Sequence, residues 1–134
     1  MTQPHGVREA ALPLDRIARP PVQLLWTGGW DSTYRLLDVL LRQRRSVQPH
    51  YVLDPFRGST GAELRAMAAM RAVIASRLDY GVEFRPTVYV DRAGIEVQAE
   101  ISQAWRDLRR QGPLGSQYEW IARYAAMSDL QGLE

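Results

Sequence analysis

The chain has 134 residues, a length that fits one domain, and carries a formal net charge of +2 at pH 7. Hydrophobic residues make up 46% of it and charged residues 24%, as in an ordinary globular protein. So small a net charge gives no argument for nucleic acid as a partner. Cysteine is absent, which excludes disulfides, thiol catalysis and a cysteine zinc site.

No apolar run approaches the roughly 20 residues needed to cross a bilayer, and the N-terminus lacks the apolar core of a signal peptide. We therefore expect a cytoplasmic protein with no membrane partner. All 17 basic residues are arginine, so any cationic contact with a ligand must come from a guanidinium group.

The chain begins with an arm and continues as one α/β domain. Residues 1–20 show no sustained hydrophobic period, and the domain is expected over residues 21–134. The apolar run Val22–Trp26 predicts a central parallel strand. It ends in Thr27-Gly28-Gly29, and an amphipathic helix is expected over Ser32–Arg44.

The turn between that strand and that helix has the composition of a phosphate-binding loop. Glycines allow positive φ and a close backbone approach, and the free N–H groups of a first helical turn attract an anion. Thr27, Ser32 and Thr33 add hydroxyl groups, and Asp31 can cap the helix or hold magnesium bound to the phosphates. A purely structural turn uses the same residue types, so local physics leaves both interpretations open.

The segment Thr27-Gly28-Gly29-Trp30-Asp31-Ser32 resembles the Ser-Gly-Gly-x-Asp-Ser signature of the PP-loop ATP pyrophosphatases, with Thr for the leading Ser. Leu24–Leu37 together with Tyr51–Thr60 is most similar to the 7-cyano-7-deazaguanine synthase-like branch of that superfamily. The resemblance covers residues 22–130. It implies a Rossmann-like domain that binds ATP and transfers AMP to a carboxylate or amide oxygen of a small-molecule substrate, releasing pyrophosphate.

Two more strands and three more helices are expected after the first helix. The predicted elements are a strand over Val47–Asp54, a helix over Thr60–Leu78 opened by the capping box Thr60–Glu63, a strand over Glu83–Val90, a helix over Ile95–Arg110 buried through Val97, Ile101, Trp105 and Leu108, and a last helix opened by the capping box Ser116–Glu119.

This order predicts a doubly wound parallel sheet with strand two beside strand one and strand three outside. It corresponds to the N-terminal half of a HUP-type domain, with three strands and four helices. The sequence stops at Gln131–Glu134, where a fourth strand is expected, which leaves Val22–Trp26 at an open edge. We expect that edge to be covered by a second copy of the chain, by another chain or by a missing C-terminal arm.

The resemblance places ATP and its magnesium ion around the glycine turn. It assigns the phosphates to the residues of the turn and helix start: Thr27, Gly28, Gly29, Asp31, Ser32 and Thr33. Asp31 would reach magnesium through the phosphates, and the backbone at Val52 and Leu53 would meet the adenine. The residues expected to act in catalysis are Asp31, Ser32 and Arg57.

Two of the expected site residues have plain structural alternatives. Arg57 could neutralise a phosphate or a substrate carboxylate with its planar fork, or be a surface arginine. Ser116 belongs to the segment Gly115-Ser116-Gln117, which falls where relatives place a glycine–polar segment near the nucleotide, or it caps the last helix. His5 and His50 lack the spacing of metal ligands, and a surface or capping position is expected for each.

Departures from the family leave other functions open. Genuine 7-cyano-7-deazaguanine synthases have a four-cysteine zinc site, and this chain has no cysteine. A nucleotide-binding module without catalysis, comparable to universal stress proteins, is the main alternative to an adenylating enzyme. An assembly protein that functions through its apolar edge is a third interpretation.

Overall fold

A computed structural model of the chain describes residues 19–134, so nearly all of the expected arm lies outside the described residues. Three strands alternate with helices in the order β1, α1, β2, α2, β3, α3 and α4. A π-helical turn follows α1 and a 3₁₀ turn follows β3. Among the described residues, no helix is both long enough and apolar enough to span a membrane.

The strands form one parallel sheet in the order β1-β2-β3, as predicted. Their bounds are Val22–Leu25 for β1, Val47–Leu53 for β2 and Val88–Asp91 for β3. Leu25 pairs with His50, and Leu53 pairs with Asp91. The carboxyl ends of all three strands therefore lie along the same edge of the sheet, where parallel folds bind their ligands.

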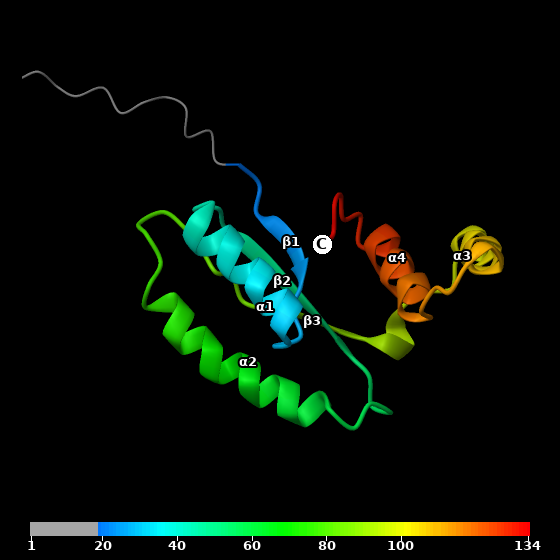
Figure 1. The fold of residues 1–134 in the computed structure, drawn as a ribbon, viewed down its shortest axis with the longest axis horizontal. Coiled ribbons are helices and arrows are strands. Elements are labelled where there is room, and N and C mark those ends of the chain that lie inside the picture. The colour runs from blue at the N-terminus through cyan, green and yellow to red at the C-terminus, as the bar shows by residue number, and fades with distance from the viewer. Residues whose placement is uncertain (1–18) are drawn as a thin grey trace, which may run out of the picture.

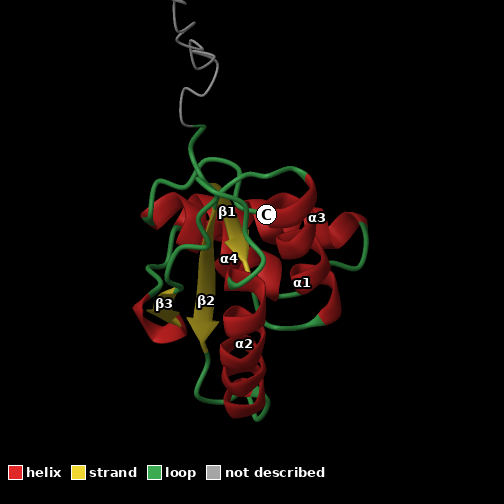
Figure 2. Ribbon diagram, turned by 90° about the vertical axis from the view of Figure 1, so that its left-hand side faces the viewer, coloured by secondary structure: helices red, strands yellow, loops and turns green. Residues whose placement is uncertain are grey.

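Helices cover both faces of the sheet, which confirms the predicted α/β fold with four helices (Figures 1 and 2). On one face lie α1 and α2, at Trp30–Leu37 and Thr60–Ala75. On the other face lies α4, at Gln117–Met127, and α3, at Ala99–Gln111, packs on α4 farther from the sheet.

Successive residues of β1 point to opposite faces and build two apolar clusters. Leu24 and Trp26 are buried in the larger cluster, which includes residues of α1 and α2. Leu25 packs against the smaller cluster, which contains Val52 and Tyr124. Because each such side chain contributes about 1.5–3 kcal/mol on burial, both faces hold β1 in place.

The first helix differs from the prediction at both ends. α1 begins at Trp30 and passes into the π-helical turn Asp38–Arg42, whereas the sequence predicts Ser32–Arg44. Arg44 has a φ of 51°, a left-handed conformation that ends the helical backbone. The Asp38 carboxylate accepts hydrogen bonds from three side chains of this stretch, and these lower its pKa to about 2: Arg42, Gln43 and Arg35.

Neither predicted capping box forms its hydrogen bonds, although Ser116 is the N-cap of α4 as predicted. The N-cap of α2 is Ser59, and the Thr60 hydroxyl instead donates to the carbonyl oxygens of Asp54 at 3.1 Å and Arg57 at 3.0 Å. At α4, the Ser116 side chain makes no capping hydrogen bond. In both cases the N-cap residue has helical φ and ψ instead of the extended conformation that is typical of a side-chain cap.

The third strand and third helix are shorter than predicted. β3 begins at Val88, and Phe84 makes only an isolated bridge to Val47. α3 begins at Ala99, and two residues expected in its buried face, Val97 and Leu108, are 76% and 56% exposed. α3 packs mainly on α4, so its apolar pattern does not correspond to a face on the sheet.

β1 is an outer strand of the sheet, and the C-terminal residue lies beside it (Figure 1). Glu134 donates its N–H to the Gln23 carbonyl at 3.0 Å, and its own carbonyl accepts from the Leu25 N–H at 2.8 Å. These are the two hydrogen bonds of a parallel pair. The Glu134 carboxylate also binds the Arg35 guanidinium at 2.5 and 3.0 Å. One register position of a fourth strand is thus filled.

Candidate functional site

The glycine turn has the left-handed backbone that its sequence predicts. Gly28 has a φ of +75°, and Gly29 is the N-cap of α1. A methyl group at Gly28 would lie 3.1 Å from Met67 Cγ and 3.5 Å from the Glu63 carbonyl oxygen. The turn is therefore pressed against α2 and requires glycine for conformation and for space.

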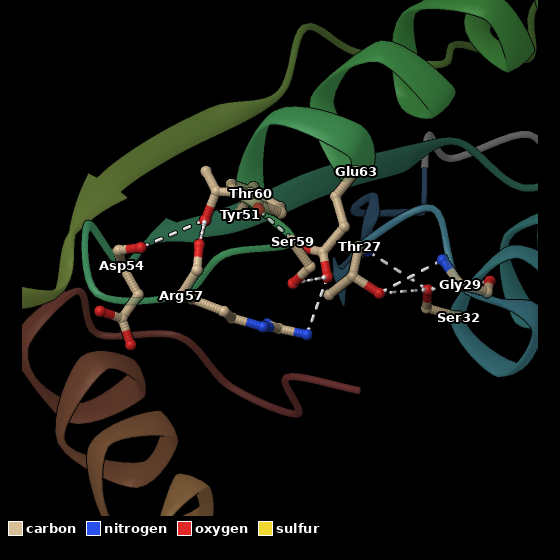
Figure 3. Close-up of polar contacts among 9 residues, drawn as sticks. All are labelled: Thr27, Gly29, Ser32, Tyr51, Asp54, Arg57, Ser59, Thr60 and Glu63. Atoms are coloured by element: carbon tan, nitrogen blue, oxygen red, sulfur yellow. Dashed lines mark hydrogen bonds and ion pairs between the residues drawn. The ribbon is translucent and has the colours of Figure 1, made fainter.

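Hydroxyl groups inside the turn fix its shape (Figure 3). Ser32 Oγ accepts from the Thr27 N–H at 3.2 Å and donates to the Gly29 carbonyl at 3.4 Å. Thr27 Oγ1 accepts from the Gly29 N–H at 3.3 Å. The Thr33 hydroxyl lies deeper and accepts from Trp26 Nε1 at 3.1 Å. These hydroxyl groups therefore hold the loop in its conformation.

The first turn of α1 leaves its backbone donors available. No side chain caps this helix, and the N–H groups of Trp30, Asp31 and Ser32 have no acceptor among residues 19–134. Such N–H groups, together with the helix dipole, favour an anion in front of the helix. Asp31 is exposed, and its carboxylate contacts no charged or hydrogen-bonding group in that part of the chain.

A cavity of about 520 Å³ opens at the carboxyl ends of β1 and β2, between the sheet and α4. It brings together four predicted site residues that are far apart in sequence: Thr27, Val52, Arg57 and Ser116. The remaining lining residues are Leu25, His50, Tyr51, Arg92, Gln117, Trp120 and Ile121. Leu53 packs into the larger core cluster, so only its backbone is placed near this edge.

Arg57 stands at the rim, half-exposed, in an ion pair with Glu63. Its Nη2 atom lies 2.8 Å from Glu63 Oε1. The other carboxylate oxygen of Glu63 accepts from the Tyr51 hydroxyl at 2.7 Å. Burial first, and this hydrogen bond second, raise the pKa of Tyr51 to about 12, so the phenol remains a donor.

Arg92 and Trp120 are lining residues that the sequence analysis did not identify. Arg92 Nη1 lies 2.6 Å from Asp54 Oδ2, and this bond lowers the pKa of Asp54. The Arg92 guanidinium also lies over the Trp120 ring, 5.8 Å from its centroid. The position of Arg92 directly after β3 is the signal that could have identified it.

His50 is buried rather than at the surface, so that expectation is wrong. Its Nδ1 lies 2.7 Å from the Tyr124 hydroxyl and its Nε2 lies 2.6 Å from Gln23 Oε1. Burial lowers the pKa of His50, which keeps the ring neutral. A neutral ring accepts from Tyr124 and donates to Gln23, linking β1, β2 and α4 below the cavity.

The residues present fit a magnesium ion carried by phosphates rather than one held by the protein. Within residues 19–134 no group of three histidine, aspartate or glutamate side chains could hold a metal ion. Asp31 offers one exposed carboxylate beside the free N–H groups of α1. Magnesium in nucleotide sites commonly uses one or two carboxylates together with phosphate oxygens.

Comparison of the chain with protein-family models, with curated proteins and with solved structures gives no match.

Proposed function

We propose that the protein binds ATP at the glycine turn and acts as a PP-loop-type adenylating domain, as in the 7-cyano-7-deazaguanine synthase-like branch that its turn resembles. One observation supports this most directly. The turn at Thr27–Ser32, with its free N–H groups, opens beside a cavity of about 520 Å³ at the carboxyl edge of a parallel sheet. Cavities of about 300–1,000 Å³ are typical for small-molecule ligands.

In this proposal the triphosphate lies in front of α1 and the nucleoside lies in the cavity. The N–H groups of the first turn of α1 and the Arg57 guanidinium balance the phosphate charge. The adenine meets the β2 backbone at Val52 and packs near Trp120. Ser116, whose side chain makes no capping bond, is left to contact the ligand.

The proposed reaction is a displacement at the α-phosphorus. A carboxylate or amide oxygen of the acceptor forms a bond to that phosphorus, the bond to the bridging oxygen breaks, and pyrophosphate leaves with the electron pair. Magnesium, when bound, would neutralise charge on the phosphates. Backbone N–H groups and Arg57 stabilise the negative charge that builds on pyrophosphate.

A nucleotide-binding module without catalysis is the second candidate. The observation that favours it is the charge balance of the rim, where Arg57 and Arg92 both already face carboxylates. Guanidinium groups that are already neutralised supply less positive charge to departing pyrophosphate, so this rim suits reversible binding better than catalysis.

The test is calorimetric titration with ATP and magnesium, followed by a pyrophosphate assay with carboxylic acid and amide acceptors. Binding with pyrophosphate release supports the adenylating enzyme, and binding without release supports the module. No binding of ATP in the titration would contradict both.

We also propose a partner for the outer edge of β1, either a second copy of the chain or another polypeptide. Glu134 pairs with only one position of that edge, and in the strand Val22 and Leu24 are buried while Gln23 and Leu25 are half-buried. Open apolar edges of this kind recruit further strands.

A further inference from the structure

The two arginines at the cavity rim differ in what surrounds them. Arg92 and its partner Asp54 lie at the α4 side, whereas Arg57 and its partner Glu63 lie beside the glycine turn. Figure 3 shows the Arg57 guanidinium extending toward Glu63 with Thr27 close by. The Arg57–Glu63 pair is therefore at the end of the cavity where a phosphate would lie.

Glu63 is held much more firmly than Arg57. Its carboxylate accepts from Tyr51 at 2.7 Å and from Ser59 Oγ at 3.0 Å in addition to the ion pair. The Glu63 side chain is 16% exposed, against 50% for Arg57. The carboxylate is thus a fixed anion on the first turn of α2, and the guanidinium is the partner that can move.

We propose that Glu63 is an internal counter-anion for Arg57, which keeps the guanidinium beside the glycine turn until a polyphosphate competes for it. The inference rests on the proposed function, because it takes the phosphates to lie at the turn. Glu63 is a positioning residue here, since it acts on the ligand through Arg57. An entering phosphate must displace its carboxylate, so Glu63 positions the arginine at a cost in affinity.

The test is calorimetric titration of the full chain with inorganic pyrophosphate. Glu63→Gln removes the competing charge and should tighten pyrophosphate binding about threefold to tenfold. This range corresponds to the loss of one partly exposed ion pair with Arg57 and of one repulsion between Glu63 and the phosphate. Glu63→Asp keeps the charge but shortens its reach to Arg57, and should also tighten binding. Arg57→Gln should weaken it. The matched control is Glu83→Gln, which breaks the exposed pair with Arg85 and should change nothing.

A crystal structure of the complex with pyrophosphate distinguishes this positioning role of Glu63 from a purely structural one. Arg57 should then bond a phosphate oxygen and lie more than about 4 Å from Glu63, beyond ion-pair range. Unchanged or weaker binding by both Glu63 variants, with Arg57→Gln still defective, would overturn this inference and leave the proposed function standing. Absence of both ATP and pyrophosphate binding in the unmodified chain would overturn the two together.

Discussion

Asp31 is exposed, as expected of a ligand-binding residue, and its side chain makes no contact that supports the fold among residues 19–134. It lies exposed in the first turn of α1, and its carboxylate has no partner among the residues that the structure describes. An acidic residue at a helix start adds only a few tenths of a kcal/mol up to about 1 kcal/mol through the dipole. A large effect of its removal would therefore report on the ligand.

Asp31→Ala should lower the rate of pyrophosphate release about 100- to 1,000-fold, the usual loss when one charge-stabilising group is removed. Its free energy of unfolding should stay within about 0.5 kcal/mol of the parent, measured by urea titration. Ser32→Ala should lose turnover as well, since its Oγ both accepts and donates within the turn. Asp107→Ala on α3 is the control, and unchanged turnover in Asp31→Ala would place the phosphates elsewhere.

Gly28→Ala should destabilise the protein by about 1–2 kcal/mol, the cost of an L side chain in the left-handed region. The φ of +75° and the approach of 3.1 Å to Met67 Cγ both act against a methyl group there. Urea unfolding measures the loss. Gly112→Ala is the matched control, because a methyl group there meets nothing within 4 Å. Equal stability of the two variants would show that the turn can rearrange freely.

At the scale of elements, local sequence patterns were sufficient to predict secondary structure where a short stretch determines its own conformation. Within the twelve residues 22–33, the apolar run predicts β1, the glycines predict the turn and the amphipathic pattern that follows predicts α1. The capping box at Thr60 failed because its hydroxyl bonds backward to Asp54 and Arg57, across a loop whose path the spacing does not encode. The buried face predicted for α3 was wrong because this helix packs on α4, and an apolar pattern does not indicate which element a helix packs on.

The same limit applies to His50. A polar residue in a strand is usually assigned to a surface or a cap, yet this ring is buried between two partners on different elements. Gln23 lies 27 positions away and Tyr124 lies 74 positions away. No short motif records such a network, so it could not be predicted from the sequence.

The His50 network predicts a pH dependence of stability. Because burial lowers the folded-state pKa below 6.5, the unfolded chain binds the proton more readily. The contribution is present above pH 6.5 and is lost as the pH falls toward the folded-state pKa. Urea unfolding should show this decline between about pH 7 and pH 5, and His50→Gln should lack it. Equal slopes in both proteins would contradict the burial of a neutral ring.

At the scale of the whole molecule, the site could be predicted in part because of topology. Parallel strands bring their carboxyl ends to one edge, so Thr27, Val52 and Arg57 meet although they come from two different connections. Trp120 could not be placed, because that requires knowing how α4 packs on the sheet. The sequence therefore predicts the end of the cavity beside the glycine turn better than its α4 side.

The proposed partner at β1 predicts association in solution. Static light scattering at micromolar concentration should give a mass above that of one chain, or a monomer that associates when mixed with its partner. Arg35→Gln should raise self-association, because it releases the Glu134 side chain from α1 and so loosens the residue that covers the β1 edge. Arg106→Gln on α3 is the control. A monomer at all concentrations with no change in Arg35→Gln would contradict self-pairing.

The hydrogen bonds of Glu134 have a practical consequence for handling the protein. Since this residue pairs in parallel with β1, any polypeptide joined to it starts out along the strand toward Thr27. An affinity tag fused there would extend toward the mouth of the cavity that Thr27 lines. Such a tag would compete with a ligand for that opening, so ligand binding is best measured after the tag has been cleaved.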